Sequence, residues 1–285
     1  MIINLNSKDL NNKNFSNTNF IEAELRGAIL FQTNFENSRF DKATLSNADL
    51  RGSNLTNVIF RGTNLHGTNL GGTTLINTDF VGAILDDANL TGAKIQNTNL
   101  SSASFINADL SGLDLSSGQL NASNFQGANL NASNLMGLNL RSTSFSKGNL
   151  RGAIMDNTYI RGSWLNLADL SGVSLHKAVL DGSSMIGANL SGVNLSDAKL
   201  RGVELVGCKL NGADLRGTDF RGSNLSRKPE PFDLRSGVHD PALTELRPAV
   251  LATLNAHCDL RGAVYDDRTQ WPFKFVVPPG VIFVK

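Results

Sequence analysis

The side chains that most often do chemistry are dispersed along this sequence of 285 residues. The four histidines are His66, His176, His239 and His257, and none has cysteines or carboxylates at the spacing of a metal site. The glycine-rich run at 67–72 has the composition of a phosphate-binding loop, but no strand-to-helix unit surrounds it. Serine, histidine and aspartate sets can be assembled from any chain so rich in serine and aspartate. The sequence therefore predicts no catalytic residue, no metal and no cofactor, and it favours an enzyme least.

A different regularity dominates the chain, a large apolar residue at every fifth position. From Leu5 to Leu225 every fifth residue is Leu, Phe, Ile or Met, forty-five times in succession. A helix is excluded, because residues five apart would point in different directions around a helix of 3.6 residues per turn and would never form one apolar face. Such a short fixed period is typical of a solenoid.

Each five-residue unit predicts a short extended side followed by a turn. The residue two places before the large apolar centre is usually small, and a polar residue stands between them, so the side chains alternate in, out, in. The residue two places after the centre is Gly in 21 of the 45 units and Asn in nine. A type II turn requires a positive φ at this position, which Gly and Asn accept. Successive turns of the chain then stack as short parallel strands about 4.8 Å apart.

The phenylalanine centres indicate the length of one coil. Six pairs of Phe centres are twenty residues apart, against three pairs at twenty-five and one at fifteen. These six pairs are Phe15/Phe35, Phe20/Phe40, Phe40/Phe60, Phe60/Phe80, Phe105/Phe125 and Phe125/Phe145. Rings that stack from coil to coil produce this spacing if four units make a coil. The forty-five units then predict about eleven coils in an all-β fold.

Several units carry a recognisable consensus. The segments 48–52, 88–92, 168–172 and 213–217 read ADLRG, ANLTG, ADLSG and ADLRG, and they resemble the A(D/N)LXX consensus of pentapeptide repeat proteins. The resemblance covers about four-fifths of the chain and implies a right-handed, quadrilateral parallel β-helix, a handedness that agrees with the rule for parallel crossovers. Family members are generally non-enzymatic, and the best understood bind DNA gyrase as acidic DNA mimics. The stretch 262–272 resembles the closing segment of many cyanobacterial members.

Charge and composition restrict the function further. The formal net charge is +1, and residues 1–225 carry eighteen basic and eighteen acidic side chains. This balance argues against both a nucleic-acid binder and an acidic DNA mimic. The first residues lack the pattern of a signal peptide and no stretch approaches membrane-spanning length, so we expect a cytoplasmic protein without membrane insertion. In such a reducing compartment the sequence favours unpaired thiols at Cys208 and Cys258, and a disulfide between them is the alternative.

The composition changes after Leu225, which predicts two parts, a β-helix over 1–225 and a cap over 226–285. All seven prolines fall within 229–279. Asp240 before Pro241 predicts a helix start, and Pro248 can open a second helical segment through His257. The cap is thus expected to combine a linker, short helices and a tail that hides the end of the core. The alternating apolar residues of the tail, 273–285, suggest an edge strand or a docking segment, on this chain or on a partner.

The first coil carries a signal about association with other chains. Lys8 and Lys13 stand where small inward residues are expected, and such charges discourage another chain from stacking on the first coil. The sequence does not fix the oligomeric state, and an end-to-end dimer is compatible with it.

Residues twenty apart form columns on the surface of such a coil, and one set of columns is a candidate protein-binding surface. Its members are Arg141, Tyr159, Arg161, Trp164, Val179, Arg201 and Arg221, with Asp181 between the arginines. Exposed aromatic residues with arginine are enriched in protein interfaces. The plainer alternative is that Asp181 and neighbouring acids pair the arginines. The sequence therefore favours a non-catalytic scaffold for an unidentified protein partner, with a DNA-mimic modulator of gyrase or topoisomerase as the second hypothesis.

Overall fold

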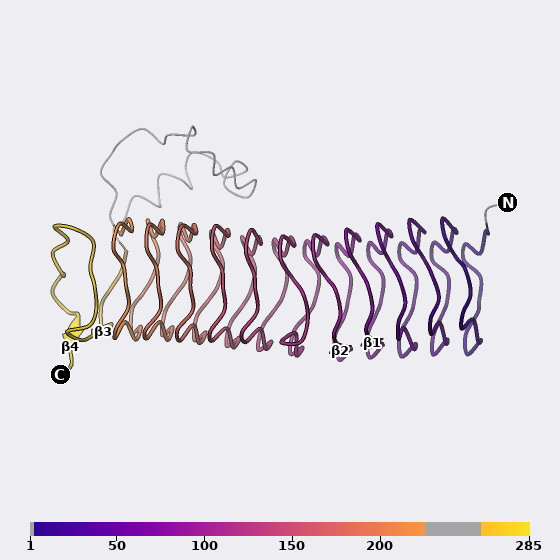
Figure 1. Ribbon diagram of the computed structural model, residues 1–285, viewed down its shortest axis with the longest axis horizontal. Helices are drawn as coiled ribbons and strands as arrows, with labels where there is room; N and C mark the ends of the chain where they lie inside the picture. Colours follow the sequence, from indigo (N-terminus) through magenta and orange to yellow (C-terminus); the bar gives the residue numbers. More distant parts are fainter. Residues whose placement is uncertain (1–2, 226–257) are drawn as a thin grey trace, which may run out of the picture. The chain divides into compact units, whose positions relative to one another are not determined.

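The computed structural model describes residues 3–225 and 258–285 (Figure 1). The chain divides into two compact units, Met1–Asn139 and Leu140–Lys285, and each is described by itself. Four strands are long enough to be labelled, β1 (Thr74–Ile76), β2 (Lys94–Gln96), β3 (Val264–Tyr265) and β4 (Ile282–Phe283). The described residues contain no helix, so none that has the length and apolarity to cross a bilayer.

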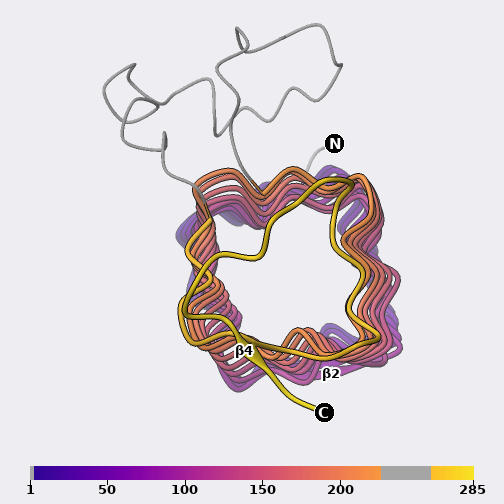
Figure 2. The ribbon, with the colours of Figure 1, turned by 90° about the vertical axis from the view of Figure 1, so that its left-hand side faces the viewer.

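Both units are built from coils of twenty residues. Parallel bridges join Asn64 to Ile84 in the first unit and Asp169 to Asn189 in the second, and the other isolated bridges between residues 4 and 224 keep the same interval. Viewed along the stack, each coil has four sides (Figure 2). The fold is the expected right-handed four-sided β-helix. The count of about eleven coils stays a prediction.

The backbone of each five-residue unit bonds mainly to the coils on either side. The Leu25 N–H donates to the Thr44 carbonyl at 2.7 Å and the Gly27 N–H to the Ser46 carbonyl at 2.9 Å. Within the unit, the Ala28 N–H closes the turn on the Leu25 carbonyl at 3.1 Å. Proline cannot donate such bonds, which explains why the chain has none before Pro229.

The third residue of the turns has a positive φ, as the abundance of glycine predicts. The same conformation also occurs at side chains that rarely adopt it, such as Glu22 (φ 57°), Lys42 (φ 56°) and Leu167 (φ 59°). A left-handed conformation costs roughly 1–2 kcal/mol at such residues. The stacking register of the coil therefore overrides the local preference of individual residues.

The core is a column of the large apolar centres. Stacked rings twenty residues apart confirm the expected pairs within the first unit, with centroids 4.7 Å apart for Phe20/Phe40 and 4.9 Å for Phe105/Phe125. The inward hydroxyls are satisfied from the same column, because Thr63 Oγ1 donates to the Phe40 carbonyl at 2.6 Å and Thr68 Oγ1 to the Leu45 carbonyl at 3.0 Å. A buried hydroxyl without a partner costs free energy, so this bond makes threonine acceptable inside.

The last coil of the second unit begins at Cys258. Parallel bridges join Asp259 to Lys209, Val264 to Asp214 and Gln270 to Asp219. The tail then pairs with its own chain, since β4 lies parallel to β3 and the Ile282 N–H donates to the Ala263 carbonyl at 2.8 Å. The helices expected after Asp240 and Pro248 fall on residues outside the described ranges. The division at residue 225 therefore also stays a prediction.

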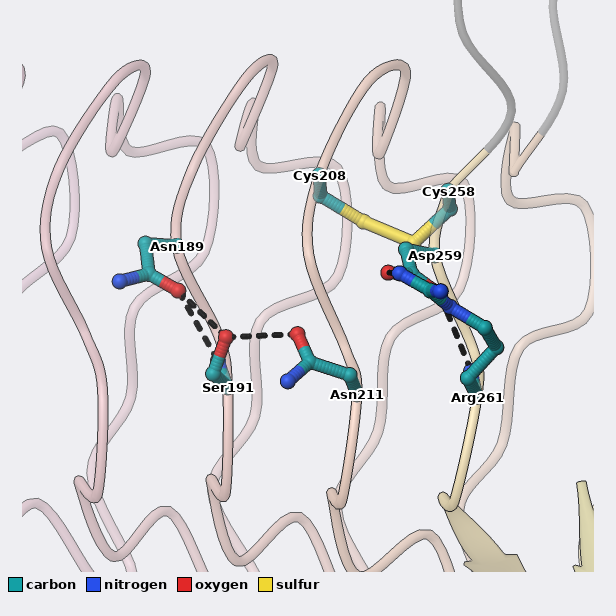
Figure 3. Close-up of a disulfide and its surroundings, with 7 residues drawn as sticks. All are labelled: Asn189, Ser191, Cys208, Asn211, Cys258, Asp259 and Arg261. Atoms are coloured by element: carbon teal, nitrogen blue, oxygen red, sulfur yellow. Dashed lines mark hydrogen bonds and ion pairs between the residues drawn. A yellow bond between two sulfur atoms is a disulfide. The ribbon is translucent and has the colours of Figure 1, made fainter.

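The expectation of unpaired thiols is wrong. Cys208 and Cys258 form a disulfide, and the described residues include no free cysteine (Figure 3). Both occupy the small inward position of their units, and the bridge between Lys209 and Asp259 stacks one directly on the other. The sequence separation of 50 concealed this contact, because bridged residues in the coils up to Asn224 are 20 apart.

Candidate protein-binding surface

The candidate surface lies at one corner of the second unit and on the side that precedes this corner. Arg141, Arg161, Arg201 and Arg221 occupy the same turn position in different coils and are exposed. On the adjoining side, bridges join Tyr159 to Val179, Val179 to Lys199 and Lys199 to Asp219. We refer to Arg141, Tyr159, Arg161, Val179, Asp181, Lys199, Arg201, Asp219 and Arg221 as the arginine corner.

Two carboxylates hold three of these arginines in place. Arg161 Nη2 lies 3.2 Å from Asp181 Oδ2, and Asp181 Oδ1 also accepts a hydrogen bond from the backbone N–H of Arg201 at 3.1 Å. Arg201 Nε and Arg221 Nη2 both contact Asp219 Oδ2, at 2.5 and 2.8 Å. The pairing that the sequence offered as an alternative to a binding surface is thus present. It leaves five basic side chains against two acidic ones in the arginine corner.

Asp219 has the strongest electrostatic environment of this corner. Hydrogen bonds from the Arg221 guanidinium, and a further one from Arg201, hold the pKa of the Asp219 carboxyl well below its usual value of 3.8, although burial opposes them. The carboxylate therefore remains ionised at neutral pH. It fixes two guanidinium groups on neighbouring coils and leaves their outer edges toward solvent.

The two predicted aromatic residues differ in accessibility. Tyr159 is 48% exposed and stands beside Arg161 in the corner. Trp164 lies on the next side of the coil and is half-buried, and its outward neighbours Ser144 and Ser184 are buried. The structure therefore places Tyr159, and not Trp164, as the accessible aromatic residue of this surface.

The structure also shows pairs of Asp and Arg two residues apart, which the sequence analysis did not predict although their spacing is visible in the sequence. Where Asp stands two residues before Arg, the guanidinium folds back on its own unit. The pairs are Asp49–Arg51, Asp214–Arg216, Asp219–Arg221, Asp259–Arg261 and Asp266–Arg268. Hydrogen bonds from its own arginine lower the pKa of Asp49, of Asp214 and of Asp259. Arg161 and Arg201 lack this preceding Asp and pair with an Asp of another coil.

The described residues contain no group of three or more His, Cys, Asp or Glu that could hold a metal ion. A shallow depression of about 470 Å³ is lined by Arg216, Val264, Asp266, Arg268, Val284 and Lys285. Both of its arginines are already paired, with Asp214 and Asp266.

The repeat, the four-sided coil and the turn chemistry agree with a single family. The family profile described as "Pentapeptide repeats" matches in eight copies, which together cover residues 3–37, 32–57, 38–75, 83–117, 119–157, 153–192 and 188–227. This chain belongs to the pentapeptide repeat family. Pentapeptide repeat proteins are generally structural scaffolds that bind other proteins, and this one shares their architecture.

Solved structures of other members are similar to this pentapeptide repeat protein. HetL, involved in heterocyst differentiation regulation in the cyanobacterium Nostoc sp. strain PCC 7120, is 28% identical, with 79% of this chain and 87% of that chain covered and a TM-score of 0.40. QnrB1, a plasmid-mediated fluoroquinolone resistance protein, is 19% identical over 91% of this chain and 94% of that chain, with a TM-score of 0.28. No curated protein matches.

Proposed function

We propose that this protein is a non-catalytic scaffold that binds an acidic protein partner through the arginine corner. The observation that carries the proposal is an exposed tyrosine beside a row of arginines that buried or half-buried carboxylates hold in place. Tyrosine and arginine are the residues that most often dominate binding energy in protein interfaces. Because carboxylates already order the guanidinium groups, these arginine side chains lose less conformational entropy when a partner binds.

The charge of the corner supports an acidic partner. Five basic side chains stand against Asp181 and Asp219, whereas the chain as a whole has a formal net charge of only +1. A locally positive surface raises the association rate of a negatively charged protein, and salt weakens this effect. The complex is therefore expected to be sensitive to ionic strength.

The test is affinity capture from a cell extract with a paired set of variants. Tyr159→Ala combined with Arg161→Gln is expected to weaken partner binding at least tenfold, and adding salt is expected to weaken wild-type binding. The matched control is Ile154→Ala with Arg151→Gln. Ile154 is 42% exposed on another side of the same unit, and Arg151 lies at another corner, 4.0 Å from Asp169.

The two variant pairs separate a specific corner from a generally adhesive surface. Equal losses in both would exclude the arginine corner, as would unchanged capture in both. Nuclease treatment of the extract is expected to leave capture unchanged, because the partner is a protein. The hypothesis of a gyrase modulator stays a prediction from the sequence resemblance, and a supercoiling assay with purified gyrase tests it.

A further inference from the structure

The disulfide lies where the period of twenty, which the isolated bridges keep up to Asn224, is first interrupted. The chain reaches Leu225, and the ladder resumes when the Cys258 N–H donates to the Leu225 carbonyl at 3.1 Å. Cys208 and Cys258 are 50 residues apart, against 20 for the bridged residues of the preceding coils, so the junction accommodates 30 additional residues. Without the disulfide, the only covalent connection between the last coil and the rest of its unit is the chain through residues 226–257.

The inward position explains why a disulfide can form here. The Cα atoms of Cys208 and Cys258 are 4.8 Å apart, which is within the range that disulfides require. In the preceding coils the same column holds Ala168 and Ala188, which are buried like the cysteines. Two cysteines therefore replace a pair of stacked alanines without a change in the path of the backbone.

We propose that this disulfide is a redox-active modification site, which a dithiol reductant opens to release the last coil, residues 258–285, from the second unit. A thiolate of the dithiol attacks Sγ of Cys258, the sulfur–sulfur bond breaks, and Cys208 leaves as a thiolate that takes up a proton. The second thiol of the dithiol then displaces Cys258 as a thiol. The dithiol is oxidised to a disulfide, and the two electrons reduce the cystine to two cysteines.

The surroundings of the sulfur atoms make this reaction depend on opening of the coil. Cys208 is 1% exposed and Cys258 is 6% exposed, so a reductant reaches them only during brief local opening of the coil, which reduction then makes lasting. Figure 3 shows the bond inside the ladder, with Asp259 and Arg261 paired next to it. The neighbouring contacts that must open include the hydrogen bonds from the Leu210 N–H to the Asp259 carbonyl, 2.7 Å, and from the Phe220 N–H to the Gln270 carbonyl, 2.7 Å.

Opening changes what the end of the second unit presents. In the closed form Trp271 stacks on Phe220, with ring centroids 5.5 Å apart, and Phe220 is fully buried. Release of the last coil exposes this ring and leaves the backbone groups of 209–220 that bond to 259–270 without partners. An exposed apolar ring beside an open strand edge is a surface to which other chains bind. The redox state would thus decide whether this end is closed or adhesive.

Hydrogen exchange of the intact protein tests the inference. The variants are the wild type before and after treatment with dithiothreitol, and Cys208→Ala/Cys258→Ala, which restores the alanines of the preceding coils. We expect amide exchange over 259–284 to accelerate at least tenfold on reduction and equally in the double variant, with residues 21–139 unchanged. Dithiothreitol is expected to have no effect on the double variant.

Two results would overturn the inference. Mass spectrometry that finds both cysteines as free thiols in the protein purified without reductant removes the disulfide itself. Equal exchange of 259–284 in the oxidised protein, the reduced protein and the alanine variant shows that the bond does not hold the coil. Neither result bears on the arginine corner, whose test uses Tyr159 and Arg161.

Discussion

At the N-terminal end, the first coil leaves its inward positions open to water. Lys8 and Lys13 are exposed where later coils bury small residues, and Leu10 and Phe15 are only half-buried. At the C-terminal end, the last coil is attached through several independent contacts. A disulfide joins it to Cys208, and Trp271 stacks between Phe220 and Phe275, with centroids 5.5 and 5.2 Å away.

The polar contacts of the two ends differ in the same direction. In the last coil, the Asp266 carboxylate accepts the Gly217 N–H at 2.8 Å, and Arg268 reaches across to Asp197 at 2.9 Å. Thr269 Oγ1 donates to the Leu215 carbonyl at 2.9 Å, as inward hydroxyls do throughout the core. In the first coil, the side chains of Lys8 and Lys13 have no such role. The end of a β-helix can thus carry exposed charges that repel other chains, or it can be covered by a packed segment. The first coil has the exposed charges and the last coil has the packed segment.

The largest expected effect comes from removing the aromatic cover. Trp271→Ala is expected to destabilise the second unit by about 3 kcal/mol, because the indole packs against three aromatic rings. Phe15→Ala, the matched change at the N-terminal end, removes a half-buried ring and is expected to cost only about 1 kcal/mol. Urea unfolding followed by circular dichroism measures both. Equal losses would show that the two ends are held equally well.

A smaller loss of stability is expected from removing the charge of Asp219, whose carboxylate binds Arg201 and Arg221. The pKa of Asp219 is lowered in the folded protein, so its contribution to stability is complete above the usual carboxyl pKa of 3.8 and is lost as the pH falls through the lowered value. Asp219→Asn is therefore expected to be less stable than the wild type at pH 7, by about 1–2 kcal/mol. The difference should narrow once the pH falls below about 4.

Asp9→Asn in the first coil is the control for this change. Asp9 is exposed, and its Oδ1 accepts the Asn11 N–H at 3.1 Å, a bond that the amide oxygen of Asn14 or Asn19 also makes in its own unit. The substitution should change the free energy of unfolding by less than about 0.5 kcal/mol at any pH. Thermal melts between pH 3 and 7 check both variants, and parallel curves for Asp219→Asn and the wild type would contradict the assignment.

The smallest effect on stability is expected at the lysines of the open end. Lys8→Ala combined with Lys13→Ala places the usual small residue at two inward positions and should change stability by less than about 1 kcal/mol. Its informative consequence is association, because the charges that keep other chains from the first coil are gone. Sedimentation velocity should then detect concentration-dependent oligomers. A variant that stays monomeric at high concentration would show that the lysines have no protective role.

The sequence alone determined the features that repeat in every five-residue unit or in every coil. The centres five residues apart, the turns with a positive φ and the twenty-residue coil all follow from local sterics and side-chain size, and the phenylalanine spacing already contained the coil length. Even the pairing of Arg51 with Asp49 has a local rule, an Asp two residues before the Arg. The apolar centres recur forty-five times, so no single exception could hide their period.

The tertiary structure decided the contacts that join distant parts of the chain. The interruption after Leu225 shifts the register by 30 residues, which conceals the stacking of Cys258 on Cys208. The spacing from Val264 to Gln270 is six residues and not five, so the position of Trp271 over Phe220 does not follow from the repeat. The accessibility of Tyr159 and the partial burial of Trp164 depend on what surrounds each side of the coil. A period specifies a position only while it is unbroken, and beyond a break only the packed ladder shows which residues meet.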